Sequence, residues 1–132
     1  MTVFAEINNE EGNIHDLDWN TYLTGFQDFQ AFMPEPDLYI YLDASPEICK
    51  QRIANRNRPE EAKMGDDADS GIPMPYLKRL HEGYLRWLEA IAPRVQIVRL
   101  DWNSFRSVKE AWVEVKEQWE KRSRFTRRLV IP

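Results

Sequence analysis

Two short apolar segments most restrict the fold that this chain can adopt. Residues 38–44 (LYIYLDA) and residues 95–101 (VQIVRLD) are apolar at most positions and rich in β-branched or aromatic side chains. Such runs are typical of buried strands in a parallel sheet. A long stretch lies between them, as a parallel connection requires. The sequence therefore predicts an α/β fold built on a parallel sheet.

Helical periodicity fills the rest of the chain on both sides of these strands. Apolar residues recur at spacings of three and four in residues 17–32, 73–90 and 104–121, and residues 46–56 follow Ser45, a typical helix cap. Residues 57–71 lack this pattern, and we expect a surface loop there. We expect Asp16 or Asp18 to cap the first helix, and Pro34 and Pro36 to end it. In the second helix, we expect the buried residues to be Ile48, Cys49 and Ile53.

The resulting order is helix, strand, helix, loop, helix, strand, helix, which predicts a Rossmann-like sheet with helices packed on its strands. Only two strands are evident, and a two-stranded parallel sheet leaves both its edges open. We therefore expect residues 1–132 to belong to a single domain with an incomplete sheet. A segment outside this sequence is expected to complete the sheet.

Composition excludes several classes of function. The net charge is −4, so no global charge favours a nucleic acid or a membrane surface, and no apolar run approaches the ~18 residues of a membrane span. The only cysteine, Cys49, cannot form an intramolecular disulfide. We expect a cytoplasmic protein that binds neither nucleic acid nor membrane.

Three arginines form the densest polar cluster. Arg52 and Arg56 are four residues apart and share one helix face, and Arg58 follows where the helix is expected to end. Three guanidinium groups together could clamp a polyphosphate. An equally simple interpretation is that they satisfy the helix dipole and pair with nearby acids such as Glu61 on the surface.

Other motifs of catalysis are absent from the sequence. It contains no G-x-x-x-x-G-K-[ST] phosphate loop, no nucleophile elbow and no zinc-ligand spacing. Asp66, Asp67 and Asp69 lack the remaining ligands of a calcium loop, so we predict no metal site within this chain.

Several short segments, taken in order, resemble the deoxynucleoside kinase family. The resemblance extends from Val3 to about Glu120. The matching segments are VFA (3–5), DWNTY (18–22), DLYIYLDASPE (37–47), RIANRNRPEE (52–61), GIPMPYLKRLHEGYLRWL (71–88) and DWNSF (101–105).

This resemblance implies roles for the residues on the phosphate-donor side. Arg52 corresponds to the arginine that packs on the base of ATP, and Arg56 and Arg58 correspond to the lid arginines that hold the phosphates during transfer. The lid then covers about residues 56–72. The loop that flanks the ATP adenine corresponds to Asn103, Ser104 and Phe105.

The same resemblance implies a nucleoside side. Phe4 corresponds to the phenylalanine that stacks on the base, Glu61 to the acceptor of the sugar 3′-hydroxyl hydrogen bond, and Tyr76 to a tyrosine that lines the site. Residues 62–70 form an acidic insertion in the lid, which could slow its closure. In the family, residues 17–32 correspond to a helix of a dimer-forming pair, so we expect a homodimer.

The family's phosphate loop and catalytic base precede the region that this chain matches. The resemblance thus implies a C-terminal portion of a kinase that transfers phosphate from ATP to the 5′-hydroxyl of a deoxynucleoside, with ATP and Mg²⁺ bound mainly by the missing part. We expect no activity from the chain alone, and activity only within a larger enzyme or beside a companion chain with a phosphate loop. The alternatives are a non-catalytic relic or interaction module, and a nucleoside-monophosphate kinase, against which Phe4 and Glu61 argue.

Overall fold

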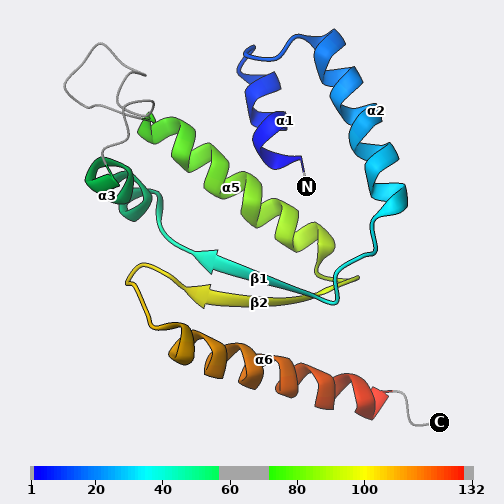
Figure 1. Cartoon of the computed structure of the whole chain (residues 1–132), viewed down its shortest axis with the longest axis vertical. Coiled ribbons are helices and arrows are strands. Elements are labelled where there is room, and N and C mark those ends of the chain that lie inside the picture. The colour runs from blue at the N-terminus through cyan, green and yellow to red at the C-terminus, as the bar shows by residue number, and fades with distance from the viewer. Residues whose placement is uncertain (1, 57–71, 130–132) are drawn as a thin grey trace.

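The computed structural model describes residues 2–56 and 72–129, which form helices on both sides of a small sheet (Figure 1). The elements, with the labels of Figure 1, are α1 (Val3–Glu10), α2 (Asp16–Phe32), β1 (Leu38–Asp43), α3 (Pro46–Arg56), α5 (Met74–Ile91), β2 (Gln96–Asp101) and α6 (Val108–Leu129). The loop predicted at residues 57–71, which includes Arg58 and Glu61, lies outside the described residues.

The sheet consists of two parallel strands among the described residues, as the sequence predicts. β1 pairs with β2 in a register that begins at Leu38 opposite Gln96 and ends at Asp43 opposite Asp101. Because paired residues of parallel strands direct their side chains to the same face, Ile40 and Leu42 share a face with Val98 and Leu100.

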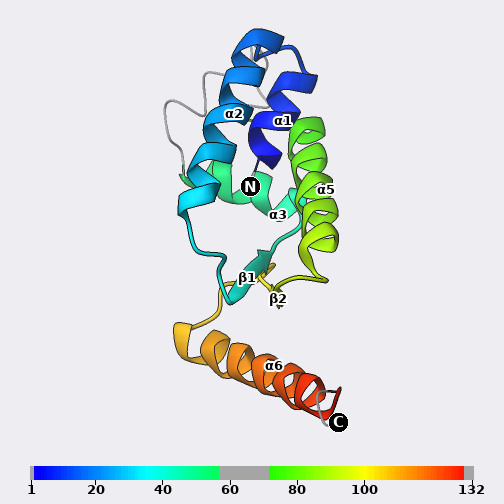
Figure 2. The same cartoon turned by 90° about the vertical axis from the view of Figure 1, so that its right-hand side faces the viewer.

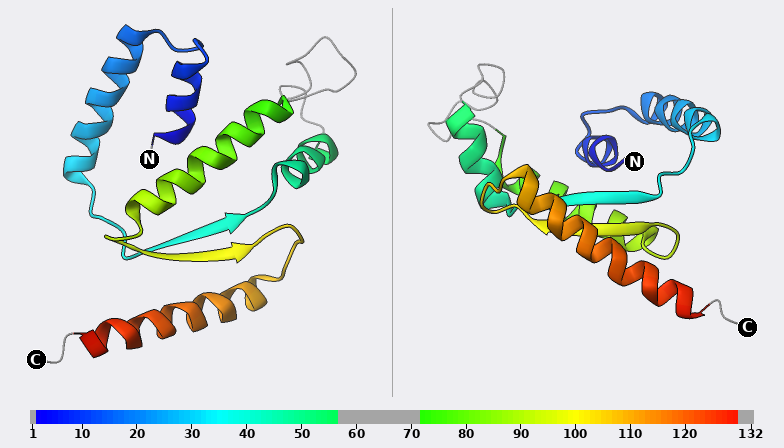
Figure 3. Two further views of the ribbon diagram at one scale, coloured as in Figure 1. Left: turned by 180° about the vertical axis from the view of Figure 1, so that it is seen from behind. Right: turned by 60° about the horizontal axis from the view of Figure 1, so that its bottom comes forward.

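Helices cover the two faces of this sheet unequally. The views in Figures 2 and 3 agree that α6 lies on one face, and that α5 and α3 lie on the other with α1 and α2 beyond α5. Aromatic contacts attach α5 to β1, since the ring of Tyr39 meets Trp87 edge-on at 5.2 Å and Tyr41 lies 6.4 Å from Tyr84. The molecule thus has the helix–sheet–helix layers of an α/β fold.

The core under α6 is small. Val98 and Leu100 of β2 are 1% exposed, and Val115 of α6 packs against them. On the same sheet face, however, Ile40 and Leu42 of β1 are almost half exposed. The apolar face of β1 therefore has little cover within the described residues, in agreement with the expected incomplete sheet.

Helix α3 begins as its sequence predicts. The backbone N–H of Ile48 donates to Ser45 Oγ at 3.3 Å and that of Cys49 donates to the Ser45 carbonyl at 2.9 Å, so Ser45 caps the helix. The predicted burial of its apolar side is wrong in degree. Ile48, Cys49 and Ile53 are only half-buried, and among the described elements α5 is the main packing partner of α3.

Helix α2 begins and ends within a residue of its predicted bounds, but its cap differs from the prediction. His15 occupies the cap position without a side-chain hydrogen bond, and Asp16 and Asp18 lie inside the first turn instead. Met33 is extended, as expected of a residue that precedes proline. None of the residues of α2 is buried, although the helix is aromatic along its length.

Helix α1 was not predicted from the sequence, and the predicted start of α6 is too early. Helix α1 has only eight residues, and α6 begins at Val108 rather than at Ser104. The start of α6 is a capping box: Ser107 Oγ accepts from the backbone of Glu110 at 3.2 Å, and the Glu110 carboxylate accepts from the Ser107 backbone at 3.0 Å.

Candidate functional site

The C-terminal ends of β1 and β2 lie side by side and are joined by hydrogen bonds. The backbone N–H of Trp102 donates to the Asp43 carbonyl at 2.7 Å, and the backbone N–H of Ser45 donates to Asn103 Oδ1 at 2.9 Å. The turn after β2 is thereby attached to the start of α3. In open parallel sheets, ligands bind just beyond the carboxyl ends of the strands, which is where this turn lies.

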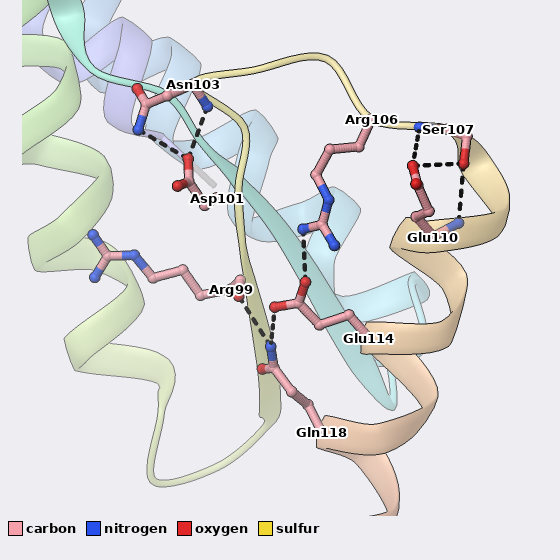
Figure 4. Close-up of polar contacts among 8 residues, drawn as sticks. All are labelled: Arg99, Asp101, Asn103, Arg106, Ser107, Glu110, Glu114 and Gln118. Atoms are coloured by element: carbon pink, nitrogen blue, oxygen red, sulfur yellow. Dashed lines mark hydrogen bonds and ion pairs between the residues drawn. The ribbon is translucent and has the colours of Figure 1, made fainter.

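Asp101 holds the turn after β2 in place. One of its carboxylate oxygens accepts from both the backbone N–H and the side-chain amide of Asn103, each at 2.9 Å (Figure 4). The Asn103 nitrogen is used in this way, so its Oδ1 faces the Ser45 N–H. Asn103, predicted as a nucleotide-flanking residue, therefore also sets the geometry of the strand ends.

Arg52 reaches across from α3 to this turn. Its Nη2 donates to the carbonyl oxygens of Trp102 at 2.6 Å and Asn103 at 3.3 Å. The guanidinium carbon lies 4.2 Å from the centre of the Phe105 ring, a cation–π contact. The Phe105 ring is 78% exposed, so a planar cation and an aromatic ring are presented together at the surface.

The remaining residues predicted on the donor side lie near this contact in the chain. Arg56 is exposed and ends α3 one turn after Arg52, and Ser104 is exposed in the turn between Asn103 and Phe105. Arg58 is outside the described residues. The structure thus brings together Arg52, Asn103 and Phe105, while the described contacts do not test the phosphate-binding role of Arg56.

A network at the start of α6 supports the turn that carries Phe105. Arg106 pairs with Glu114 at 2.6 Å, and Gln118 donates to the Glu114 carboxylate at 3.0 Å and to the Arg99 carbonyl of β2 at 3.2 Å (Figure 4). Hydrogen bonds from Ser107 lower the pKa of the Glu110 carboxyl. Both ends of the turn are therefore fixed, one by β2 and the other by α6.

The predicted nucleoside-side residues form a second group between α1 and α5. The rings of Phe4 and Tyr76 meet at 87° with their centres 6.2 Å apart. Phe4 is 59% exposed, which leaves its ring open to stacking. Glu61, the third predicted member, lies outside the described residues.

Sequence reasoning missed one member of this group, Asn8. Its Nδ2 donates to the carbonyl oxygen of Phe4 at 2.8 Å and to the hydroxyl of Tyr76 at 3.0 Å. Asn8 and Tyr76 are 68 residues apart, and α1 itself was not predicted. The sequence signal that could have indicated Asn8 is its spacing of four residues from Phe4, which puts the two residues in register on a helix.

Ion pairs and close packing fix α1 on α5 around this group. Arg79 of α5 donates to Glu10 and to Glu11, each at 2.7 Å. Val3 and Ile7 are buried against Gly83, where an added Cβ would lie 2.8 Å from Val3 Cγ1. Phe4 and Tyr76 are thus carried by two helices in fixed contact.

A mainly apolar cavity of about 260 Å³ lies beside the C-terminal half of β1. Burial there raises the pKa of the Tyr41 hydroxyl, and the nearby Asp43 carboxylate raises it further. The lining residues come from β1, α3 and α5 and their connections, and they are Tyr41, Leu42, Ala44, Pro46, Cys49, Leu77, Leu80, His81 and Tyr84.

Residues 2–56 and 72–129 contain neither a metal-binding cluster nor a membrane-spanning helix. Within these ranges, no three His, Cys, Asp or Glu side chains gather closely enough to hold a metal ion. In the same part of the chain, no helix combines the length and the hydropathy needed to cross a membrane.

Comparison with known proteins identifies the family. A family model described as deoxynucleoside kinase matches residues 1–123, and the chain belongs to this family. The deoxyadenosine kinase of Dictyostelium discoideum is 34% identical over 119 residues, which are 90% of this chain and 45% of that protein. The deoxyguanosine kinase of the same organism is 34% identical over 104 residues, 78% of this chain and 34% of that protein.

A solved structure shows the same fold. The deoxyadenosine kinase from M. mycoides with bound dCTP matches 92% of this chain and 58% of that chain, with a TM-score of 0.67 and 21% identity. The fold is therefore part of the α/β fold of the phosphate-loop kinases, as predicted from the sequence. The chain spans less than half the length of the two Dictyostelium relatives.

Proposed function

We propose that this chain supplies the base-stacking, lid and nucleoside-side residues of an enzyme that phosphorylates a deoxynucleoside at its 5′-hydroxyl with ATP. The observation that carries the proposal is the Arg52–Phe105 contact at the carboxyl edge of the sheet, with the guanidinium held by two backbone carbonyls. This arrangement fits the adenine of ATP, since Arg and aromatic planes stack well on planar rings.

Each residue has a place in the proposed reaction. The 5′-hydroxyl oxygen bonds to the γ-phosphorus as the bond to the bridging oxygen of ADP breaks, and the hydroxyl proton leaves to a base. Phosphoryl transfer depends on positioning and on neutralising the developing charge. Arg56 and Arg58 supply that positive charge, Phe4 stacks on the nucleoside base, and Glu61 accepts from the sugar 3′-hydroxyl.

The reaction needs groups beyond those of this sequence. A phosphate loop cradles the phosphates with backbone N–H groups, and the 132 residues contain no such motif. We therefore propose that ATP and Mg²⁺ are bound mainly by a part that carries the loop, either in a longer polypeptide or in a companion chain. On its own, the 132-residue chain should be inactive.

One observation favours a second candidate function, that of a non-catalytic interaction module. Apolar side chains are exposed on β1 and α6, including Ile40, Leu42 and Trp112, which is 55% exposed. The edge of β1 beside them, which pairs with no other described strand, can pair with a strand of another polypeptide. The same surface would receive the remaining strands of a kinase, so activity must distinguish the two functions.

A coupled phosphorylation assay tests the proposal. The purified chain is mixed with ATP, Mg²⁺ and each deoxynucleoside, first alone and then with a phosphate-loop polypeptide encoded beside it. Activity only in the mixture, abolished by Arg56→Ala and retained by Lys78→Ala at an exposed site of α5, supports the proposed kinase. Activity of the chain alone would contradict the need for a phosphate loop. Tight association of the two chains without any activity would favour the interaction module.

A further inference from the structure

The side-chain amide of Asn8 has a fixed orientation. Its Nδ2 lies 2.8 Å from the carbonyl oxygen of Phe4, an atom that can only accept a hydrogen bond. Rotation of the amide by 180° would place Oδ1 against that carbonyl oxygen. In the observed orientation, Oδ1 instead accepts from Asn13 Nδ2 at 3.3 Å. The nitrogen of Asn8 therefore faces both Phe4 and Tyr76.

This orientation determines the role of the Tyr76 hydroxyl. The second N–H of the Asn8 amide donates to Tyr76 Oη at 3.0 Å, so the tyrosine oxygen is the acceptor in this pair. An amide N–H cannot accept, and the hydroxyl proton must point elsewhere. Tyr76 is half-buried beside the exposed ring of Phe4, on the side proposed to hold the nucleoside.

We propose that Asn8 is a positioning residue that makes Tyr76 a hydrogen-bond donor toward an acceptor of the bound nucleoside. This inference rests on the proposed function of the Phe4 and Tyr76 group. Asn8 acts through Tyr76: it occupies a lone pair of the phenolic oxygen and leaves the O–H to the ligand. The recognised group is an oxygen or nitrogen with a free lone pair, on the sugar or on the base.

The end of α1 keeps Asn8 in place. The backbone N–H of Asn13 donates to the Asn8 carbonyl at 2.9 Å and that of Gly12 donates to the Asn9 carbonyl at 2.9 Å, the paired bonds of a Schellman motif. Gly12 has a φ of +77°, which glycine adopts without strain. This turn brings the Asn13 side chain back to Asn8 Oδ1 and completes the hydrogen bonding of the amide.

Asn8 is not the only link between α1 and α5. Arg79 pairs with Glu10 and Glu11, and Val3 and Ile7 are buried next to Gly83. These contacts should keep α1 seated when the Asn8 amide is altered, so its effect on ligand binding can be separated from loss of structure.

The most direct variant is Asn8→Asp, which replaces the donor with an acceptor of nearly the same shape. The Tyr76 O–H would then turn toward Asp and away from the ligand. Asn9→Asp is the matched control, because it introduces the same charge one residue further along α1, where the side chain donates to the Ile14 carbonyl. Both variants are also made in a Tyr76→Phe background.

The first readout needs no ligand. NMR spectra of the side-chain amides in the ¹⁵N-labelled full chain should show a changed chemical shift for one of the two Asn8 Nδ2 protons in Tyr76→Phe. The chemical shift of the other proton, which is hydrogen-bonded to the Phe4 carbonyl, should stay the same. If neither proton moves, Asn8 does not contact Tyr76 in solution. That result overturns the inference and leaves the proposed function standing.

The second readout is deoxynucleoside affinity, measured by titration calorimetry on the full chain, alone and with its phosphate-loop companion. Asn8→Asp should weaken binding about tenfold, the effect of about one lost hydrogen bond. Asn9→Asp should change it less than about twofold, and Asn8→Asp should have no further effect when Phe replaces Tyr76. Titration of the free nucleobase and of the 2′,3′-dideoxynucleoside locates the acceptor on the base or on the sugar.

The outcomes separate the two claims. An equal loss for Asn8→Asp with and without the Tyr76 hydroxyl would mean that Asn8 acts on structure alone, which overturns the inference. A wild-type chain that binds no deoxynucleoside in either setting would contradict the proposed function, and the inference with it.

Discussion

The guanidinium of Arg52 lies over the ring of Phe105, 4.2 Å from its centre, although the two residues belong to separate strand–helix units. Arg52 is in the helix after β1, and Phe105 is in the turn after β2. The contact exists because Asp101 and Asn103 shape that turn and tie it to the start of α3. An exposed cation–π contact at the carboxyl ends of the strands thus follows from the parallel pairing of β1 with β2.

The first prediction concerns nucleotide affinity. In the assembly of this chain with the phosphate-loop part, Phe105→Leu should raise the Kd for ATP about two- to tenfold, because stacking between two rings is worth about 0.5–1.5 kcal/mol beyond the area that it buries. The affinity for the deoxynucleoside should stay unchanged. Phe32→Leu is the control, since Phe32 is 88% exposed at the end of α2. Equal effects of the two substitutions on ATP binding would argue against an adenine site at Phe105.

A second prediction concerns self-association through α2. The rings of Trp19 and Tyr22 stack at 5.6 Å, those of Tyr22 and Phe26 stack at 6.2 Å, and Phe29 continues this face with 71% exposure. If the proposed homodimer forms here, Phe29→Glu should weaken dimerisation at least about tenfold, since burial of a Phe contributes about 1.5–3 kcal/mol.

Analytical ultracentrifugation across a concentration series measures this dimerisation. Gln27→Glu is the control, because it adds the same charge to an exposed position of α2 and leaves the aromatic face intact. A wild-type chain that stays monomeric at high concentration, alone and in its assembly with the phosphate-loop part, would rule out this interface.

A third prediction follows from the capping box of α6. Hydrogen bonds from Ser107 lower the pKa of Glu110 in the folded state below its ordinary value of 4.5. A carboxyl with a lowered folded pKa stabilises the fold above its unfolded pKa and loses this effect as the pH falls through the folded value. The stability advantage of the wild type over Glu110→Gln should therefore be complete at pH 7 and shrink below about pH 4.5.

Urea unfolding of both proteins at several pH values measures this difference. Glutamine can occupy the same position of a capping box without titrating, which makes Glu110→Gln a suitable reference. An advantage that stays constant down to pH 2.5 would mean that Glu110 does not titrate in contact with Ser107.

The strands and the longer helices could be predicted from the sequence, because their hydrophobic patterns are long and locally consistent. Helix α1 was missed because eight residues give only two turns, and its cap residue Thr2 makes no side-chain hydrogen bond. Its stability comes from burial of Val3 and Ile7 against a helix that is distant in sequence. The start of α6 was placed too early because the Ser107–Glu110 capping box was not recognised.

Candidate site residues could be named from the sequence only through its resemblance to the deoxynucleoside kinases, and their roles stay predictions. The resemblance indicated Arg52, Asn103 and Phe105, and their contacts join them. Asn8 carries no such signal, since an asparagine in an unpredicted helix becomes informative only when Tyr76 is placed beside it. The aromatic residues of α2 had the right periodicity for a helix, but periodicity does not tell whether the packing partner lies in the same chain.

The last prediction tests how α1 is seated on α5. A Cβ at Gly83 would lie 2.8 Å from Val3 Cγ1 and 3.3 Å from Ile7 Cδ1, and both side chains are buried. Overpacking of this kind costs about 1–3 kcal/mol, whereas alanine in a helix gains about 1 kcal/mol over glycine. We expect Gly83→Ala to lower the free energy of unfolding by up to about 2 kcal/mol.

Gly25→Ala in α2 separates the two effects, because nothing lies within 4 Å of the added Cβ and only the gain in helix propensity remains. That variant should raise the free energy of unfolding by about 0.5–1 kcal/mol. Denaturant unfolding followed by circular dichroism measures both variants. If Gly83→Ala stabilises the chain as much as Gly25→Ala does, Val3 is not packed against α5 in solution. The Phe4–Tyr76 pair, which depends on the same helix contact, would then lose its structural basis.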